Sequence, residues 1–350
     1  MTPDQWNTLR RCARGESLPA VPVALIVDSP WIPGYLGIST LDYLFAPDVW
    51  LESNLRVIRE FPNINFIPGF WAEIGMGAEP SAFGCKTLFY PDKTPQVLPL
   101  VETWENLPEL NEPNPQTDGF LPYLLTLYRR ARPRLNDAGH DVRIVAARGP
   151  LTLATHLVGV SEFLMGIKTD PAKAHRLLSV LSRFITQWLE AQAEAAGPTV
   201  QGIMVLDDIT GFLSPADFQT FALPYLQQIF RAFPEALKIF HNDTNNVVPY
   251  RFLRDIPVDI FNFTHLQSLA RVRELCGPEI CLMGNIPPLD ILAQGTPEQV
   301  AEAVTTAKSS LPDTTRWLLS AGGGVSPGTP GANIRAFSDA AATLGPAEAK

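Results

Sequence analysis

A histidine and an aspartate stand two residues apart in His241-Asn242-Asp243, directly after an apolar run. Residues i and i+2 of an extended chain share a face, so these side chains could bind one metal ion or orient one proton. The ligand count favours a metal-free His–Asp pair, and a zinc ion on His241 and Asp243 is the alternative. A zinc ion would need a third ligand, for which the candidates are Glu73, Asp207 and His265.

Two adjacent aspartates, Asp207 and Asp208, follow a second apolar run. Neighbouring side chains on a strand point to opposite faces, so one carboxylate enters a site and the other caps the turn or helix that follows. We expect Asp207 and Glu73 to act in catalysis, because a carboxylate can bind substrate nitrogen, accept a proton or bind a metal. The simpler alternative is that both aspartates only solvate a loop.

Three further features are typical of substrate binding. Arg148 could hold a carboxylate or phosphate with two parallel hydrogen bonds, or form an ion pair with a neighbouring strand-end aspartate. The run Gly322-Gly323-Gly324 lets backbone N–H groups approach an anion, or simply forms a tight turn. Aromatic residues, Trp71 among them, could line an apolar pocket or pack in the core.

Short, almost continuously apolar runs precede these residues, as is typical of strands buried on both faces. We predict strands at 23–27, 64–68, 143–147, 202–206, 237–241, 258–263, 279–283 and 316–320. Amphipathic helices are predicted at 171–195, 215–233 and 297–309, the last with Thr296 as N-cap.

This alternation predicts an α/β chain folded as a (β/α)8 TIM barrel, a single domain over residues 1–350 with an N-terminal extension. The polar residues that follow the strands would then meet at the barrel mouth. A doubly wound open sheet is the alternative, but the chain lacks its G-x-G-x-x-G turn. Segment 90–120, rich in proline and acidic residues, is predicted to be a lid-like loop over the mouth, and 345–350 a frayed tail.

Composition narrows the function. The net charge of -9 disfavours nucleic-acid binding, because phosphate neutralisation needs a basic surplus. The sequence has neither a signal-peptide pattern nor a membrane-length apolar stretch. The four cysteines are scattered and are expected to be reduced thiols, which favours a cytoplasmic protein.

Four segments together resemble the uroporphyrinogen decarboxylase superfamily, which includes cobalamin-dependent methyltransferases. This resemblance implies a (β/α)8 barrel with its site at the mouth. The matching segments are Arg148-Gly149-Pro150-Leu151-Thr152-Leu153-Ala154; Leu213-Ser214-Pro215-Ala216-Asp217-Phe218 with Leu223-Pro224-Tyr225; Met283-Gly284-Asn285-Ile286-Pro287-Pro288 with Gly295-Thr296-Pro297; and Gly322-Gly323-Gly324 with Thr329-Pro330 and Asn333-Ile334.

Departures from the family pattern bear on function. The decarboxylases carry an arginine-rich segment that grips substrate carboxylates, but residues 28–35 contain no arginine. The resemblance places Glu73 where those enzymes have an aspartate at the mouth, and His156 where they have a tyrosine. Thiol-activating methyltransferases hold zinc with a His-x-Cys pair and a later cysteine; this chain has His241, Asp243 and Gly323 at those positions.

The resemblance therefore implies an enzyme that transfers a methyl group from a small donor, such as a methoxy or methylamine compound, to a corrinoid or a corrinoid protein. Zinc and a corrinoid (cobalamin) are the cofactors it implies, and a homodimer is compatible with it. Cofactor-independent decarboxylation of uroporphyrinogen or a related tetrapyrrole is the alternative, and a non-catalytic small-molecule-binding barrel is the third. We expect Asp207, His241, Asp243 and Glu73 to be catalytic, and Arg148, Trp71, His156, Asn285 and Gly323 to bind substrate.

Overall fold

The computed structural model describes residues 1–27, 29–311 and 313–344. The predicted frayed tail at 345–350 lies outside the described residues, as does Asp28, which follows the first predicted strand.

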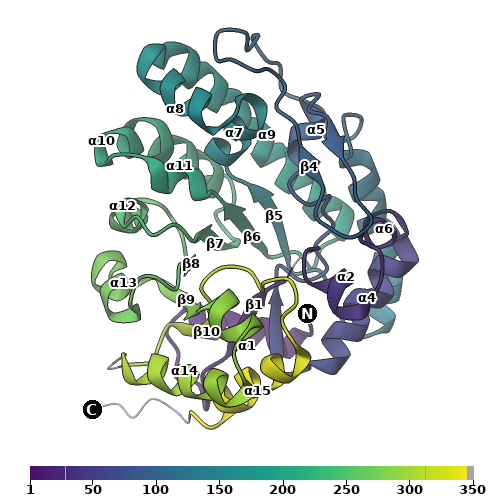
Figure 1. The fold of residues 1–350 in the computed structure, drawn as a ribbon, viewed down its shortest axis with the longest axis vertical. Helices are drawn as coiled ribbons and strands as arrows, with labels where there is room; N and C mark the ends of the chain where they lie inside the picture. Colours follow the sequence, from purple (N-terminus) through teal and green to yellow (C-terminus); the bar gives the residue numbers. More distant parts are fainter. Residues whose placement is uncertain (28, 312, 345–350) are drawn as a thin grey trace.

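Eight parallel strands form one sheet that curls into a nearly closed barrel (Figure 1). All eight predicted strands are confirmed, with ends that shift by no more than three residues. They are β1 (Val23–Ile26), β2 (Ile64–Ile67), β5 (Ile144–Arg148), β6 (Gly202–Leu206), β7 (Leu237–Asn242), β8 (Ile260–Phe263), β9 (Cys281–Ile286) and β10 (Trp317–Ala321). The order β2-β1-β10-β9-β8-β7-β6-β5 leaves β2 and β5 as the two edges, with no ladder between them among the described residues.

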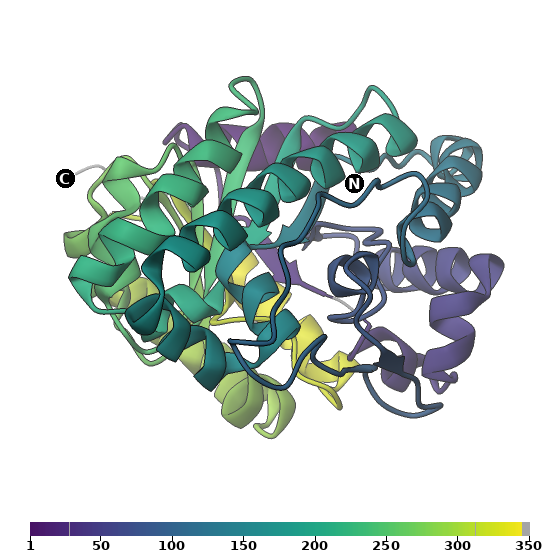
Figure 2. The same ribbon diagram turned by 90° about the horizontal axis from the view of Figure 1, so that it is seen from above.

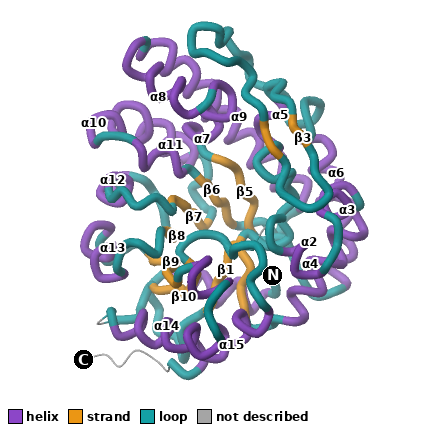
Figure 3. The backbone as a smooth tube through the Cα atoms, viewed as in Figure 1, coloured by secondary structure: helices purple, strands orange, loops and turns teal. Residues whose placement is uncertain are grey.

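Helices surround the strands, as Figure 3 shows with helices in purple and strands in orange. The predicted helices at 171–195 and 297–309 are confirmed as α9 and α14, and Thr296 forms a capping box with Gln299. The predicted helix 215–233 is divided into α10, a π-helical turn η2 and α11.

The α-helices are α1 (Pro3–Ala13), α2 (Ile32–Leu36), α3 (Thr40–Phe45), α4 (Pro47–Glu60), α5 (Ala78–Ala82), α6 (Leu121–Asp137), α7 (Pro150–Val158), α8 (Val160–Thr169), α9 (Pro171–Ala196), α10 (Pro215–Asp217), α11 (Leu223–Arg231), α12 (Val248–Arg251), α13 (Leu269–Cys276), α14 (Pro297–Ser309) and α15 (Gly331–Ala342). Single turns of 3-10 or π geometry are η1 (Asp208–Phe212), η2 (Phe218–Ala222), η3 (Leu253–Asp255) and η4 (Pro288–Ala293).

Two apolar clusters hold the barrel together. Alternate strand residues such as Ile144, Met204 and Ile239 form the inner cluster, which Trp6 and Leu9 of α1 join. The intervening strand residues pack outward with the helices in a larger cluster. Helix α1 therefore packs on the interior of the barrel, and the alternation decides which polar side chains face inward beyond the strand ends.

The segment predicted to be a lid carries only the short strand β4 (Gln96–Val97), which pairs with β3 (Thr87–Leu88). It runs as a long blue loop in Figure 2. The N–H groups of Leu100 and Val101 donate to the Leu157 carbonyl of α7, and that of Trp104 to Glu162 of α8. These bonds fix the loop to helices α7 and α8; its action as a lid stays a prediction.

In the part of the chain that the structure describes, no single helix has the length and apolarity needed to cross a membrane, although the sharply bent pair α7 and α8 meets that test when taken together.

Candidate active site

The inner face of the barrel continues past the strands into a cluster of ionisable side chains. On β7, Ile239 belongs to the inner apolar cluster, so His241 and Asp243 face the same way at i+2 and i+4. On β6, Met204 is inward, which by the same alternation gives Asp208 the inward direction and Asp207 the outward one.

Three of these groups meet. The His241 Nε2 atom lies 3.6 Å from Asp208 Oδ1 and 4.0 Å from Asp243 Oδ2. The backbone N–H of Asp243 donates to Asp208 Oδ1 at 3.0 Å, which ties the loop after β7 to the loop after β6. The imidazole is 7% exposed and the carboxylates 40% and 44%, so the open side of the cluster is acidic.

The orientation of His241 is fixed from behind by Asn262 on β8. Its Nδ1 atom lies 2.7 Å from the Asn262 amide Oδ1. The Asn262 Nδ2 atom donates to the carbonyls of Met283 and Ala321, so its amide oxygen must be the atom that faces the ring. An amide oxygen only accepts, so Nδ1 carries a proton, and Nε2 is the ring nitrogen that faces the two aspartates.

The surroundings of Asp243 change its acidity. Burial raises its pKa; His241 opposes that rise and Asp208 adds to it. Gly323, with a φ of +123°, stands directly against this group, since a Cβ there would lie 2.8 Å from Asp243 Oδ2. The resemblance placed residues 241, 243 and 323 at the three ligand positions of the thiol-activating relatives, and this contact brings Gly323 against Asp243.

Asp207, which we expected to be catalytic, lies outside this cluster. Its carboxylate is fully buried and accepts hydrogen bonds from the N–H groups of Leu151 and Thr152 and from the Thr152 hydroxyl. It thereby caps the N-terminus of α7 from the neighbouring strand. Burial raises the pKa of Asp207 to about 7, although these three hydrogen bonds act in the opposite direction.

Glu73 and Arg148 form a second group, in which Arg148 Nη2 lies 3.1 Å from Glu73 Oε2 with both side chains buried. Trp71 stacks on this pair, with its ring centroid 4.7 Å from the guanidinium carbon. The pair joins the chain after β2 to the end of β5, across the open edge of the barrel. Arg148 therefore takes the ion-pair alternative, with a glutamate as its partner rather than an aspartate.

The other two predicted substrate-binding residues, His156 and Asn285, are not among the three clustered groups. Burial, and then Arg148, lower the pKa of His156 to about 4, so its ring is neutral at pH 7. Its Nε2 atom is buried and has no partner among the described residues. The Asn285 amide donates to the backbone carbonyls of Gln267 and Thr264.

The three-residue cluster fits a divalent metal. One ligand atom from each of Asp208, His241 and Asp243 lies within 4.8 Å of the other two. Ligand atoms on a tetrahedral zinc are about 3.3 Å apart, so a small contraction would close the set. The bond from Nδ1 to Asn262 is the outer contact that metal-binding histidines usually make. The third potential ligand is thus Asp208, and none of Glu73, Asp207 and His265 belongs to this group.

The sequence did not predict two residues of this cluster. They are Asp208, as a member of the site, and Asn262, as the residue that orients His241. Asn262 offered a signal, because it is polar inside the apolar run Ile260–Phe263. No comparable signal separated Asp208 from Asp207.

The eight-stranded barrel with polar groups beyond its strand ends defines the class, a TIM-barrel protein with its candidate site at the mouth. The chain belongs to the uroporphyrinogen decarboxylase (URO-D) family, whose model matches residues 5–344. This confirms the resemblance inferred from the sequence and places the chain in an enzyme superfamily.

The relatives of this chain include a methyltransferase and uroporphyrinogen decarboxylases. A methylated-thiol–coenzyme M methyltransferase of Methanosarcina mazei is 26% identical over 269 residues, which cover 76% of this chain and 70% of the relative. A uroporphyrinogen decarboxylase of Pseudomonas syringae pv. syringae is 28% identical over 277 residues, with 75% and 74% covered. The solved structure of a methyltransferase from Methanosarcina mazei superposes with a TM-score of 0.81 over 96% of this chain and 97% of its own, at 19% identity, which confirms the fold.

Proposed function

We propose that this protein transfers a methyl group from a small O-methyl or N-methyl donor to a corrinoid or a corrinoid protein. The observation that carries the proposal is the His241 imidazole held by Asn262, with its Nε2 atom facing two carboxylates. This cluster can bind the heteroatom of a methyl donor through a proton carried by one of its groups or through a metal ion.

The reaction requires help for the leaving group. When the bond between the methyl carbon and the heteroatom breaks, its electron pair stays on the heteroatom, which then needs a proton or a Lewis acid. Burial favours the protonated form of Asp243 by raising its pKa, so this side chain is suited to deliver a proton. A zinc ion on Asp208, His241 and Asp243 would supply Lewis-acid chemistry at the same place.

The donor set also favours oxygen or nitrogen over sulfur. The pattern of the thiol-activating relatives includes two cysteines, where this chain has Asp243 and Gly323. Carboxylate oxygens are harder ligands than thiolates and leave a metal less suited to a thiol. A methoxy or methylamine compound is therefore the donor class that this site fits.

The corrinoid is expected at the mouth, where large apolar side chains are exposed. Phe212 is 62% exposed, Leu266 60% and Leu289 50%. They follow β6, β8 and β9, so each lies beyond the carboxyl end of a strand. Such a rim fits the apolar face of a macrocycle or of the protein that carries it. The corrinoid supplies the nucleophile that receives the methyl group.

Decarboxylation is less well supported. Uroporphyrinogen bears many carboxylates, and the cation that could grip one, Arg148, is paired with Glu73 and buried. If Arg148 turned away from Glu73 to bind a substrate carboxylate, the negative charge of Glu73 would stay buried beside it without that ion pair.

The test is an anaerobic assay of the purified full chain with cob(I)alamin and a panel of methoxy, methylamine and methylthiol donors, followed by the absorbance of methylcobalamin. We expect turnover with an O- or N-methyl donor and a loss of at least about 100-fold in His241→Ala. His140→Gln, a histidine outside the cluster, is the control and should keep its rate.

Three results would contradict the proposal: no transfer from any donor by a folded protein, equal rates in wild type and His241→Ala, or decarboxylation of uroporphyrinogen III in a parallel incubation. The first would favour a binding protein and the third the decarboxylase.

A further inference from the structure

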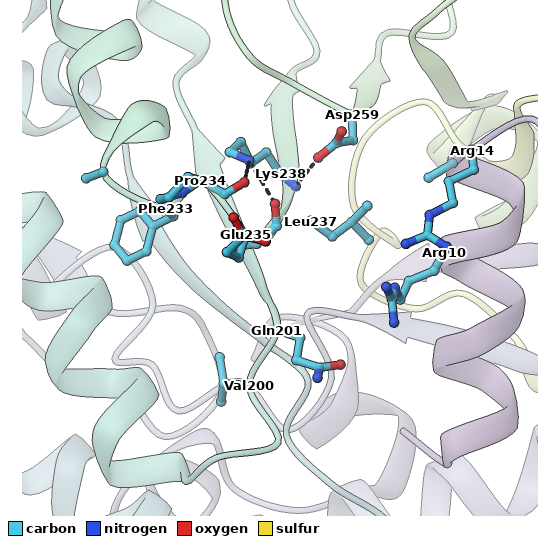
Figure 4. A pocket seen from close by; sticks show the side chains of 13 residues that line it. Arg10, Arg14, Val200, Gln201, Phe233, Pro234, Glu235, Leu237, Lys238 and Asp259 are labelled. Carbon is cyan, nitrogen blue, oxygen red and sulfur yellow. Dashed lines mark hydrogen bonds between the residues drawn. The ribbon is translucent and has the colours of Figure 1, made fainter.

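A cavity of about 750 Å³ opens at the amino-terminal end of the barrel, where β6, β7 and β8 begin (Figure 4). Its walls come from α1, the segment before β6, the loop from α11 to β7 and the residue before β8. His241 and its neighbours stand at the opposite ends of these strands, so the cavity is separate from the candidate active site. Sites for small ligands commonly measure about 300–1,000 Å³.

Two arginines line this cavity, Arg10 in the last turn of α1 and Arg14, its C-cap residue. Arg10 and Arg14 are four residues apart, so they share one helix face, and Figure 4 shows both side chains beside the cavity. Among residues 1–27, 29–311 and 313–344, neither guanidinium has a hydrogen bond or an ion pair. Arg11, between them, is paired with Glu16.

Three other charged residues line the cavity, and none of them forms an ion pair with Arg10 or Arg14 among the described residues. The Lys238 amine is buried and donates to the carbonyls of Pro234 and Ala236. Asp259 accepts a hydrogen bond from the backbone N–H of Lys238, and Glu235 is exposed to solvent. Phe233 and Leu237 add an apolar wall.

We propose that this cavity binds a small organic anion, with its phosphate or carboxylate group on Arg10 and Arg14 and its carbon skeleton against Phe233. Arginine binds both anions through paired N–H donors. Three cations and two carboxylates line the cavity, so its walls carry a surplus of one positive charge in a protein whose net charge is -9. The binding site is independent of the methyl-transfer proposal.

Calorimetric titration of the full chain tests this, with pyrophosphate and citrate as the phosphate and carboxylate probes, at a constant ionic strength set with KCl. We expect saturable binding of at least one probe. The double variant Arg10→Gln/Arg14→Gln should weaken it by at least about tenfold, because hydrogen bonds to charged groups are lost. Arg251→Gln, which removes an exposed arginine of α12, is the matched control and should bind as the wild type does.

The thermal midpoint, measured with and without each probe, separates binding from a structural role. Arginines near the carboxyl end of a helix also stabilise its dipole. If that is their only role, the double variant lowers Tm equally with and without the anion and leaves the affinity unchanged, which overturns the proposal. Absence of saturable binding by both probes overturns it as well. A preference for one probe identifies the anionic group and supports the site.

Discussion

His241 on β7 and Asn262 on β8 are register partners, and the imidazole Nδ1 lies 2.7 Å from the amide oxygen. This one contact determines the tautomer of the ring and therefore which nitrogen faces Asp208 and Asp243. The chemistry proposed for the mouth depends on this orientation, because only the nitrogen without a proton can bind a metal or accept a proton.

Asn262→Ala should release the ring and weaken zinc binding by about 10- to 100-fold. Competition titration with a zinc chelator measures the affinity, and 15N shifts of the imidazole report the tautomer without any activity assay. Asn65→Ala removes a buried asparagine of β2 whose side chain, among the described residues, bonds to the Val23 carbonyl alone, so it controls for loss of a strand amide. Equal zinc affinity in the wild type and Asn262→Ala would show that Asn262 does not orient His241.

The barrel could be predicted because its strands are apolar on both faces, which made eight runs stand out. Because both faces are apolar, the sequence does not indicate which side chains of a strand point into the barrel and which point out. Residues 202–206, Gly-Ile-Met-Val-Leu, contain no polar residue that marks the inner face, so the sequence could not decide between Asp207 and Asp208. The register of β6 against β7, which pairs Leu206 with His241, resolves it.

Contacts between distant strands were beyond the sequence for another reason. Glu73 and Arg148 are 75 residues apart, and they meet because the barrel brings its two unpaired edges together. Closure depends on the tilt and stagger of all eight strands, which no local pattern encodes. The local signals, Thr296 before α14 and the glycines near Asp243, were accessible because each acts over a few residues.

Asp207→Asn should change how stability depends on pH. Burial raises the pKa of Asp207 from 3.8 to about 7. Between these values the folded protein holds a proton that the unfolded chain has released, so this group stabilises the fold below pH 4 and its contribution is lost as the pH rises through 7. The slope is at most about 1.4 kcal/mol per pH unit. Urea unfolding at pH 5 and pH 7 should show a larger decline in the wild type than in Asp207→Asn, and parallel profiles would refute the shift.

Asp207→Ala tests the cap itself. It removes the acceptor for two N–H groups of α7, so we expect a loss of about 1–3 kcal/mol in the free energy of unfolding. The expected loss is mainly structural, because the side chain lies outside the His241 cluster. A zinc affinity that falls with Asp207→Ala but not with a comparably destabilising variant elsewhere would contradict this assignment.

Gly323→Ala should disturb the site beyond its effect on stability. The new Cβ would lie 2.8 Å from Asp243 Oδ2, so the carboxylate must move. Gly328→Ala is a matched control, since Gly328 also has a positive φ, +80°, but a Cβ there meets nothing within 4 Å. Both variants should lose roughly 1–2 kcal/mol of stability through backbone strain. Only Gly323→Ala should also lose methyl transfer and zinc binding; equal losses in the two would remove Gly323 from the site.

Glu73→Gln should destabilise the fold by about 3–5 kcal/mol, because it removes a buried carboxylate charge beside the Arg148 guanidinium at the open edge of the barrel. Glu73 also accepts a hydrogen bond from the Ser29 N–H at 2.8 Å. If the glutamine oxygen keeps this bond, its NH2 group faces the Arg148 guanidinium, which is also a donor, or the apolar methionine of a double variant, which accepts nothing. The double variant Glu73→Gln/Arg148→Met removes both charges, and its loss should be smaller than that of Glu73→Gln alone, as urea unfolding can measure. If the double variant is instead the less stable one, Arg148 contributes through its stacking on Trp71 rather than through the ion pair, and the strand edges are joined by that stack.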